Sequence, residues 1–196
     1  EGNLARIHMG AADTFGVDLY GDGLIQLAVG TQHAAGSKFV AENTGSLVAD
    51  GGRVLMSAAA ASSVLDSVIN NSGVIQARSL VNNNGEIILS GAGATVNVSG
   101  TVDVSGANIA GTIKIGGDYQ GGGTLAHAAN VNISDTAVLK ADAEDNGNGG
   151  TIIAWSDVAT TSRGRFSAQG GANGGNGGLV ETSSAGVLDV GGTIVD

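Results

Sequence analysis

The chain has 196 residues, 35 of them glycine, with no proline, no cysteine and a formal net charge of −10. This acidic balance disfavours binding to phosphate backbones, and the lack of cysteine excludes disulfides and thiolate metal sites. No apolar run approaches the length that crosses a bilayer, so no transmembrane segment is expected. Because aromatic residues are only 3% of the chain, its interior must be built from Val, Ile, Leu and Ala.

Short runs in which apolar and polar residues alternate follow one another along the chain. Each run puts its apolar side chains on one face, and residues that favour tight turns (Gly, Asn, Asp and Ser) separate the runs. The pattern therefore predicts many short strands. In chain order the clearest runs are Asp22–Leu27, Thr95–Ser99, Thr101–Ser105, Thr112–Ile115, Val131–Ser134 and Leu188–Val190.

One segment, Ser57–Asn70, departs from this pattern because it is rich in alanine. Its first residue is a candidate N-cap, and Val64 and Leu65 each have an apolar partner four residues later. Two interpretations stay open. The segment forms either a short helix near residues 57–69, or a strand followed by an asparagine turn.

A longer repeat organises the runs. A glycine or alanine, an alternating run, an alanine and a glycine-rich turn recur, and such units must stack on their neighbours to bury a core. An antiparallel sandwich is the alternative, but the Asn-Gly pairs lie inside longer turns rather than in two-residue hairpins. We therefore predict one continuous parallel β-helix over residues 1–196, with roughly 20–25 residues per coil and a length of about 40 Å. The repeats begin at Gly45, Gly73, Gly100, Ala137, Gly164 and Gly186.

Five longer motifs are specific enough to suggest a family. They are GDGLIQLAV at Gly21–Val29, ADGGRVLMSA at Ala49–Ala58, LDSVINNSGVIQA at Leu65–Ala77, GGTIIAWSD at Gly149–Asp157 and SAQGGANGGNGGLVETS at Ser167–Ser183. These stretches resemble bacterial exoproteins of two-partner secretion, the filamentous-haemagglutinin adhesin family. The resemblance covers most of the chain from its first motif onward.

This resemblance implies a right-handed parallel β-helix that is secreted or held at the bacterial cell surface after export through a cognate outer-membrane transporter. Most members are adhesins that contact host or matrix glycans or surface receptors, and biofilm matrix proteins are among them. The family's N-terminal secretion domain carries Asn-Pro motifs, which this proline-free chain lacks. We therefore expect that region to be missing or to lie upstream. We also expect the chain, which begins at Glu1, to be a piece of a longer protein whose terminal coils expose strand edges.

The acidic turn over residues 142–148 is the best metal candidate. Asp142, Glu144 and Asn146 occupy alternate positions before a glycine, as in the opening of a calcium loop. The twelfth position of such a loop would be Ile153, so the closing bidentate Glu is absent. A solvated turn is the favoured interpretation and calcium the alternative. No other cofactor is expected.

Candidate glycan contacts are Trp155 and Tyr119, because an aromatic ring offers a flat face on which a sugar stacks. For Trp155, which ends a predicted strand, a packed or half-buried position is the favoured alternative. No Gly-x-Ser-x-Gly elbow and no Gly-Lys phosphate loop occurs. His8, His33 and His127 lie far apart, without the spacing of metal ligands.

Asparagine recurs at the predicted coil corners, where stacked amides can hydrogen-bond from one coil to the next. Three Asn-x-Ser sequons begin at Asn70, Asn97 and Asn132. A chain this rich in Asn and Ser carries some sequons by chance, so a structural role is favoured. The corner residues are Asn43, Asn70, Asn71, Asn82, Asn83, Asn84, Asn130 and Asn146.

These observations favour a rod segment of an adhesin over an enzyme, and two alternatives stay open. A carbohydrate-active β-helix enzyme needs two carboxylates about 5–10 Å apart, for which Asp103, Asp118, Asp135 and Asp157 are scattered candidates. A binding module for a host carrier protein, such as a haem carrier, needs an insert between coils. The gap at residues 116–130 is its one candidate, although an additional coil is the favoured interpretation of that gap.

Overall fold

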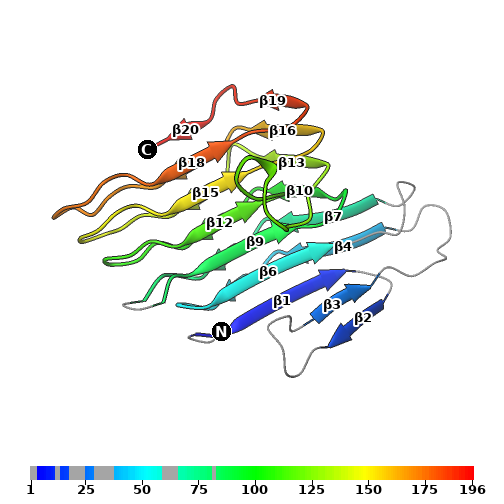
Figure 1. Cartoon of the computed structure of the whole chain (residues 1–196), viewed down its shortest axis with the longest axis horizontal. Helices are drawn as coiled ribbons and strands as arrows, with labels where there is room; N and C mark the ends of the chain where they lie inside the picture. The colour runs from blue at the N-terminus through cyan, green and yellow to red at the C-terminus, as the bar shows by residue number, and fades with distance from the viewer. Residues whose placement is uncertain (1–3, 12–13, 18–24, 29–37, 59–65, 81–82) are drawn as a thin grey trace.

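The computed structural model describes residues 4–11, 14–17, 25–28, 38–58, 66–80 and 83–196. Three parallel sheets of six strands each run through the molecule, as Figure 1 shows. Neighbouring strands of a sheet are one coil apart in sequence, so the chain winds as the predicted right-handed parallel β-helix. Within the described ranges, the one helical element is a single 3₁₀ turn, η1, at Tyr119–Gly121.

Each coil contributes one strand to each sheet. In spatial order, the first sheet contains β1 (Arg6–Ala11), β6 (Arg53–Ala58), β9 (Glu86–Ser90), β12 (Thr112–Ile115), β15 (Thr151–Ala154) and β18 (Leu179–Thr182). The second contains β4 (Lys38–Asn43), β7 (Asp66–Asn71), β10 (Thr95–Val98), β13 (Asn130–Ile133), β16 (Ala159–Ser162) and β19 (Val187–Asp189). The third contains β5 (Ser46–Val48), β8 (Val74–Gln76), β11 (Thr101–Asp103), β14 (Val138–Lys140), β17 (Arg165–Ser167) and β20 (Ile194–Val195).

The pairing register gives the length of one coil. Lys38 pairs with Asp66, 28 residues later, and Asn130 pairs with Ala159, 29 residues later. The predicted 20–25 residues per coil are therefore too few. With six strands about 4.8 Å apart, each sheet is also only about 24 Å deep, so the predicted length of about 40 Å is wrong.

One coil is longer than the others. Thr95 pairs with Asn130, 35 residues later, yet β10 and β13 are direct neighbours in the second sheet. The additional residues lie between β12 and β13 and add no strand to any sheet. The gap at residues 116–130 is therefore an insertion within a coil, and its interpretation as an additional coil is wrong.

The core lies between the three sheets and is built from columns of stacked apolar side chains. One column in the third sheet runs through Ile75, Val102, Leu139 and Phe166, which pair in register on successive strands and are fully buried. Similar columns line the inner faces of the other two sheets. The alternating pattern of each strand directs these side chains inward, as the sequence predicts.

Glycine at one corner of the helix has a steric cause. A Cβ on Gly73 would lie 2.2 Å from the Gly45 carbonyl oxygen, and a Cβ on Gly100 would lie 2.0 Å from that of Gly73. Successive backbones approach too closely there for a side chain, which explains the repeat starts at Gly73 and Gly100, whereas a Cβ on Gly45 would meet no atom within 4 Å. The start at Gly186 is out of register, because Gly186 precedes β19 whereas the equivalent corner of the last coil precedes β20.

The helix considered for residues 57–69 is wrong at both ends. Strand β6 runs through Ala58, and strand β7 begins at Asp66, so Ile69 lies in a strand. The alternative is confirmed for its strand, at Asp66–Asn71, but not for its asparagine turn, because Asn70 and Asn71 lie within that strand. Residues 59–65 lie outside the described residues.

The N-terminal region departs from the coil pattern. Strands β2 (Thr14–Val17) and β3 (Ile25–Ala28) pair with each other in an antiparallel manner, apart from the three parallel sheets. The predicted strand at Asp22–Leu27 is confirmed from residue 25 onward. Its first residues lie outside the described ones.

The last coil leaves apolar side chains in solvent. Leu188 is 45% exposed, Ile194 51% and Val195 58%. By contrast, Thr160 and Phe166, which pair with Leu188 and Val195 on the preceding coil, are fully buried. Strands β18, β19 and β20 also form the outer edges of their sheets. The described residues contain no helix that is long and apolar enough to cross a membrane.

Candidate functional site

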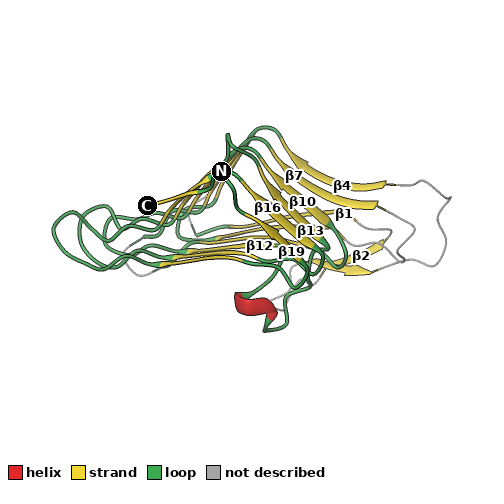
Figure 2. Cartoon of the chain, turned by 90° about the horizontal axis from the view of Figure 1, so that it is seen from above, coloured by secondary structure: helices red, strands yellow, loops and turns green. Residues whose placement is uncertain are grey.

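The insertion between β12 and β13 forms a strap, which we define as residues 116–129. The strap folds back over the outer face of the first sheet, where Figure 2 shows it projecting from the body with η1 at its tip. Its far end is held by the Ala126 carbonyl, which accepts a hydrogen bond from the Ser90 hydroxyl at the end of β9. The His127 carbonyl accepts another from the Gly93 N–H at 2.9 Å. The insertion is thus docked on neighbouring coils.

A charged pair holds the near end of the strap. Lys114 Nζ of β12 donates to Asp118 Oδ2 at 2.8 Å, and the Tyr119 N–H donates to Asp118 Oδ1 at 2.8 Å. The Lys114 contact, followed by the Tyr119 N–H, holds the pKa of Asp118 below its usual range. The Lys114 and Asp118 side chains are 21% and 27% exposed, so the pair is only partly shielded from water.

Two further polar contacts hold the middle and the far end. The Gln120 N–H donates to both carboxylate oxygens of Glu181 on β18, at 3.0 and 3.1 Å. His127 Nδ1 lies 3.0 Å from Asp157 Oδ1, just after β15. The strap therefore bridges strands from three successive coils, and each of these three side-chain anchors includes a carboxylate.

Trp155 lies beneath the strap. It follows β15 directly, and the backbones of Gly117 and Gly121 lie against its indole. A Cβ on Gly117 would be 2.5 Å from Trp155 Cδ1, and one on Gly121 would be 2.4 Å from Cζ2. The His127 ring packs edge-on at a centroid distance of 6.1 Å. The half-buried position favoured from the sequence is the one observed.

The indole N–H of Trp155 is unusual. Nε1 is fully buried and has no hydrogen-bond partner among the residues that the structure describes. A buried donor without an acceptor costs about 1–3 kcal/mol, and most buried indoles do find a partner. The covered position of Trp155 therefore carries an energetic penalty that contact with an acceptor would relieve.

Tyr119 occupies the tip of the strap and is 48% exposed. The next residue, Gln120, has a φ of 53°, in the left-handed region that non-glycine residues rarely adopt. The Gln120 amide donates to the Tyr119 hydroxyl at 3.2 Å. The structure therefore brings both aromatic candidates to one face, with Trp155 covered and Tyr119 on the cover.

Two isoleucines on the outer face of the first sheet are buried in the same region. Ile88 and Ile153 pair with Lys114 on either side of β12, so they face outward, opposite to the core columns. Even so, Ile88 is 3% exposed and Ile153 only 2%. Because the strap is anchored around them, it accounts for their burial.

The acidic turn does not gather its three predicted ligands. Asp142 Oδ1 accepts from the Ser167 hydroxyl at 2.6 Å and from the Gln169 N–H at 2.9 Å, while Glu144 pairs with Arg78. Across the described part of the chain, no three His, Asp or Glu side chains are placed to hold a metal ion. The calcium interpretation of Asp142, Glu144 and Asn146 stays a prediction, and the geometry gives its carboxylates protein partners.

Asparagines do stack, but the best ladder lies on a strand face. Asn97 donates to Asn70 Oδ1 at 2.9 Å, and Asn132 donates to Asn97 Oδ1 at 2.9 Å. These are the three sequon asparagines, and they face outward on β7, β10 and β13. At the corner, Asn43 donates to Asn71 Oδ1 at 2.8 Å. Asn97 was not predicted as a ladder residue, although its spacing from Asn70 matches one coil.

The remaining candidates are engaged separately. Asp103 accepts from the Ser105 N–H at 2.8 Å, far along the chain from the Asp118 and Asp157 contacts. His8 Nε2 lies 2.9 Å from the Ser57 hydroxyl, and burial, followed by the charge of Arg53, lowers the pKa of His8. His33 lies outside the described residues. Asp103, Asp118 and Asp157 therefore each contact a different polar partner.

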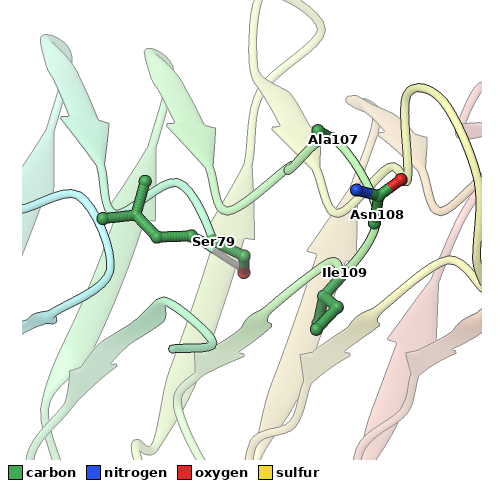
Figure 3. Close-up of a pocket in the computed structure, with 5 residues that line it drawn as sticks. Ser79, Ala107, Asn108 and Ile109 are labelled. Carbon is green, nitrogen blue, oxygen red and sulfur yellow. The ribbon is translucent and has the colours of Figure 1, made fainter. Parts of the chain in front are cut away.

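A small pocket opens between the turns that follow β8 and β11. It has a volume of about 150 Å³ and is lined mainly by apolar atoms of Ser79, Leu80 and residues 107–109, as Figure 3 shows. The Ser79 hydroxyl donates to the Val104 carbonyl at 3.3 Å and accepts from the Gly85 N–H at 3.0 Å. Because this hydroxyl is used structurally, the pocket offers no activated nucleophile.

Comparisons with known proteins add one clear similarity. No protein-family profile matches the chain, and no curated protein sequence matches it significantly. Among solved structures, the fold is similar to that of the HMW1 secretion domain from Haemophilus influenzae, with a TM-score of 0.67 and 22% sequence identity. The match covers 99% of this chain and 56% of that chain, so this chain spans about half the length of its structural relative. At this identity, the similarity shows the fold.

Proposed function

We propose that the chain is a β-helical segment of a secreted bacterial exoprotein of the two-partner secretion type, and that the parent protein is an adhesin of the filamentous-haemagglutinin kind. The observation that carries the proposal is the structural similarity to a secretion domain along nearly the whole chain. The five family-like motifs support it independently, because they were identified from the residues alone.

The same similarity bears on the partner in export. From the sequence, the Asn-Pro region of the secretion domain is expected to be missing or to lie upstream, because the chain has no proline. The structural relative is itself a secretion domain. We therefore propose that a cognate outer-membrane transporter exports the parent protein and that this chain is among the exported residues. The location that we propose is therefore outside the cell, with the secreted protein retained at the cell surface.

In this proposal the coils act as a passive rod. Stacked Val, Ile and Leu columns hold the shape, and the outer faces and turns are presented to host or matrix glycans or to a surface receptor. Weak binding by one segment suffices, because many copies on one cell raise the effective concentration of binding sites.

The strap gives some support to a second candidate, a binding module for a host carrier protein. Such a module needs an insert between coils, and residues 116–129 are an insert. An enzyme has less support, because Asp103, Asp118 and Asp157 each have a local partner.

A glycan array tests the adhesive role directly. The purified chain is applied with calcium and, in parallel, with a chelator. Saturable binding to a defined group of glycans supports an adhesive face on this segment, and loss of binding with chelator supports calcium at residues 142–148. If the array shows no binding, the adhesive role of this segment is wrong, and the segment is a spacer within the parent protein.

A further inference from the structure

We propose that the strap is a displaceable cover over a saccharide-binding site whose platform is the indole of Trp155, and that the ligand is an uncharged saccharide. This inference deepens the proposed adhesive function and rests on it. It assigns that function to one place on the outer face of the first sheet.

Two glycine backbones of the strap lie against the indole, and the His127 ring contacts it edge-on. Gly117 and Gly121 present bare backbone to the ring, and neither has room for a Cβ. A flat, side-chain-free layer on an indole face is also what a bound sugar ring supplies, since its C–H groups pack on the electron-rich face of the ring. The strap therefore occupies the ring as a ligand would, without interlocking side chains that prevent its release.

The indole N–H is left without an acceptor beneath this cover. With the strap closed, Trp155 Nε1 is buried and finds no partner among the described residues. A sugar hydroxyl is an acceptor of suitable size, and ligand sites combine an apolar platform with a few polar groups that fix orientation. Lys114, Glu181 and Asp157 each contact the strap, through Asp118, Gln120 and His127 respectively, and their polar groups become available when these contacts break.

The strap can also open without disturbing the helix. Its two ion pairs are partly exposed, and glycines at positions 116, 121 and 123 have positive φ, a conformation that glycine adopts without steric cost. Ala128, by contrast, is fully buried in the core cluster. The base of the strap is therefore fixed, and the part that moves is the tip around Tyr119.

The charge around the platform selects the ligand class. Asp118, Asp157 and Glu181 carry three negative charges against one positive charge on Lys114 and, when it is protonated, one on His127. In a chain with a net charge of −10, a carboxylated or sulfated sugar would be repelled. A neutral saccharide meets no such cost and can accept from Lys114 while donating to the carboxylates.

Fluorescence provides the test, because Trp155 is the single tryptophan of the chain. The variant Gly121→Ala places a Cβ where it would lie 2.4 Å from the indole, so the strap cannot close. The matched control is Gly122→Ala, whose Cβ would approach only the Tyr119 carbonyl, at 3.2 Å. Lactose, maltotriose and triacetylchitotriose serve as neutral probes, and sialyllactose as the charged one. A second opening variant, Glu181→Ala, removes the acceptor of the Gln120 N–H.

We expect red-shifted emission in Gly121→Ala and Glu181→Ala but not in Gly122→Ala. In Gly121→Ala, which keeps every proposed ligand contact, we also expect at least one neutral probe to quench or blue-shift the emission saturably, with an affinity at least ten-fold higher than for the wild type, and sialyllactose to bind at least ten-fold more weakly than that probe. If neither opening variant changes the emission, or if no neutral probe alters it in Gly121→Ala, the inference is overturned. A wild-type array signal that persists in Trp155→Ala would keep the adhesive function and overturn only this site.

Discussion

Isoleucine side chains are buried on both faces of the first sheet, but in two different ways. On its inner face, Ile113 and Ile152 are fully buried within the stacked core columns. On its outer face, Ile88 and Ile153 are almost as inaccessible, at 3% and 2% exposed. Their cover is a strap held by partly exposed polar contacts rather than a neighbouring layer of the helix.

The difference shows that equal burial does not mean equal stability. Inner side chains leave the core only when coils separate, so their burial contributes to global unfolding. The outer cover is held by ion pairs and hydrogen bonds that water can replace, each contributing little. We therefore expect core substitutions to lower the free energy of unfolding, and strap substitutions to change local exposure instead.

The largest effect is expected from Phe166→Ala. Phe166 is the bulkiest fully buried side chain among the described residues, and its removal leaves a cavity in the third-sheet column. We expect a loss of about 3–5 kcal/mol in the free energy of unfolding, measured by urea denaturation. Phe166→Leu is the control and should cost clearly less. Equal midpoints for wild type and Phe166→Ala would show that the last coils do not unfold with the rest.

A smaller loss is expected from Asn97→Ala on the outer face of the second sheet. This change removes both hydrogen bonds of the central ladder residue, at 2.9 Å each. We expect a loss of about 1–2 kcal/mol in the same denaturation experiment. Asn132→Ala, which removes one of the two bonds, should cost about half as much. If both variants have the same free energy of unfolding as the wild type, the ladder does not contribute to stability and the prediction is wrong.

A third prediction concerns acid and the strap. The Lys114 contact lowers the pKa of Asp118, so the stabilisation is fully present above the ordinary Asp range and is lost as pH falls through the lowered value. Because the pair is partly exposed, the effect should be under about 1 kcal/mol. Trp155 emission followed against pH should show strap opening on acidification, with Asp118→Asn already partly open at neutral pH. Asp135→Asn, in an exposed turn, is the control. Identical profiles for wild type and Asp118→Asn would contradict this role.

The smallest effect is expected at His8. Burial, followed by the charge of Arg53, lowers its pKa in the folded state. The unfolded chain therefore takes up the proton first, and stability decreases as pH falls below the ordinary His range until the lowered value is passed. Because the side chain stays partly accessible to water, we expect a change under about 0.5 kcal/mol. His8→Gln should remove this part of the pH dependence, whereas an unchanged dependence would assign it to other groups.

The coil body could be predicted because its determinants are local. Alternation over three to five residues directs side chains inward, and a glycine repeat marks the corner at Gly45, Gly73 and Gly100. Register is less local, which is why Gly186 was assigned to the wrong corner. The extended segment Asp66–Asn71 was ambiguous because its apolar residues fit both a helical and a strand spacing until neighbouring coils select the strand.

The strap could not be predicted, because its position depends on contacts between residues that are far apart in sequence. Its glycine-rich residues have no periodicity, and its anchors join positions far apart in sequence, such as Gln120 and Glu181. Trp155 and Tyr119 are candidates by residue type alone, and nothing in the sequence indicates that the segment carrying Tyr119 lies over Trp155. The ladder at Asn97 did have a signal, because asparagines followed by x-Ser recur one coil apart.

Hydrogen exchange measured by mass spectrometry tests the contrast between the two faces most directly. Peptides covering residues 117–126 should exchange at least about 100-fold faster than peptides covering β12 and β15, because the strap opens locally while the coils stay stacked. Gly121→Ala should accelerate the strap peptides further and leave the strands unchanged. If the strap exchanges at the rate of β12 and β15, it opens only with global unfolding, and a displaceable cover is contradicted.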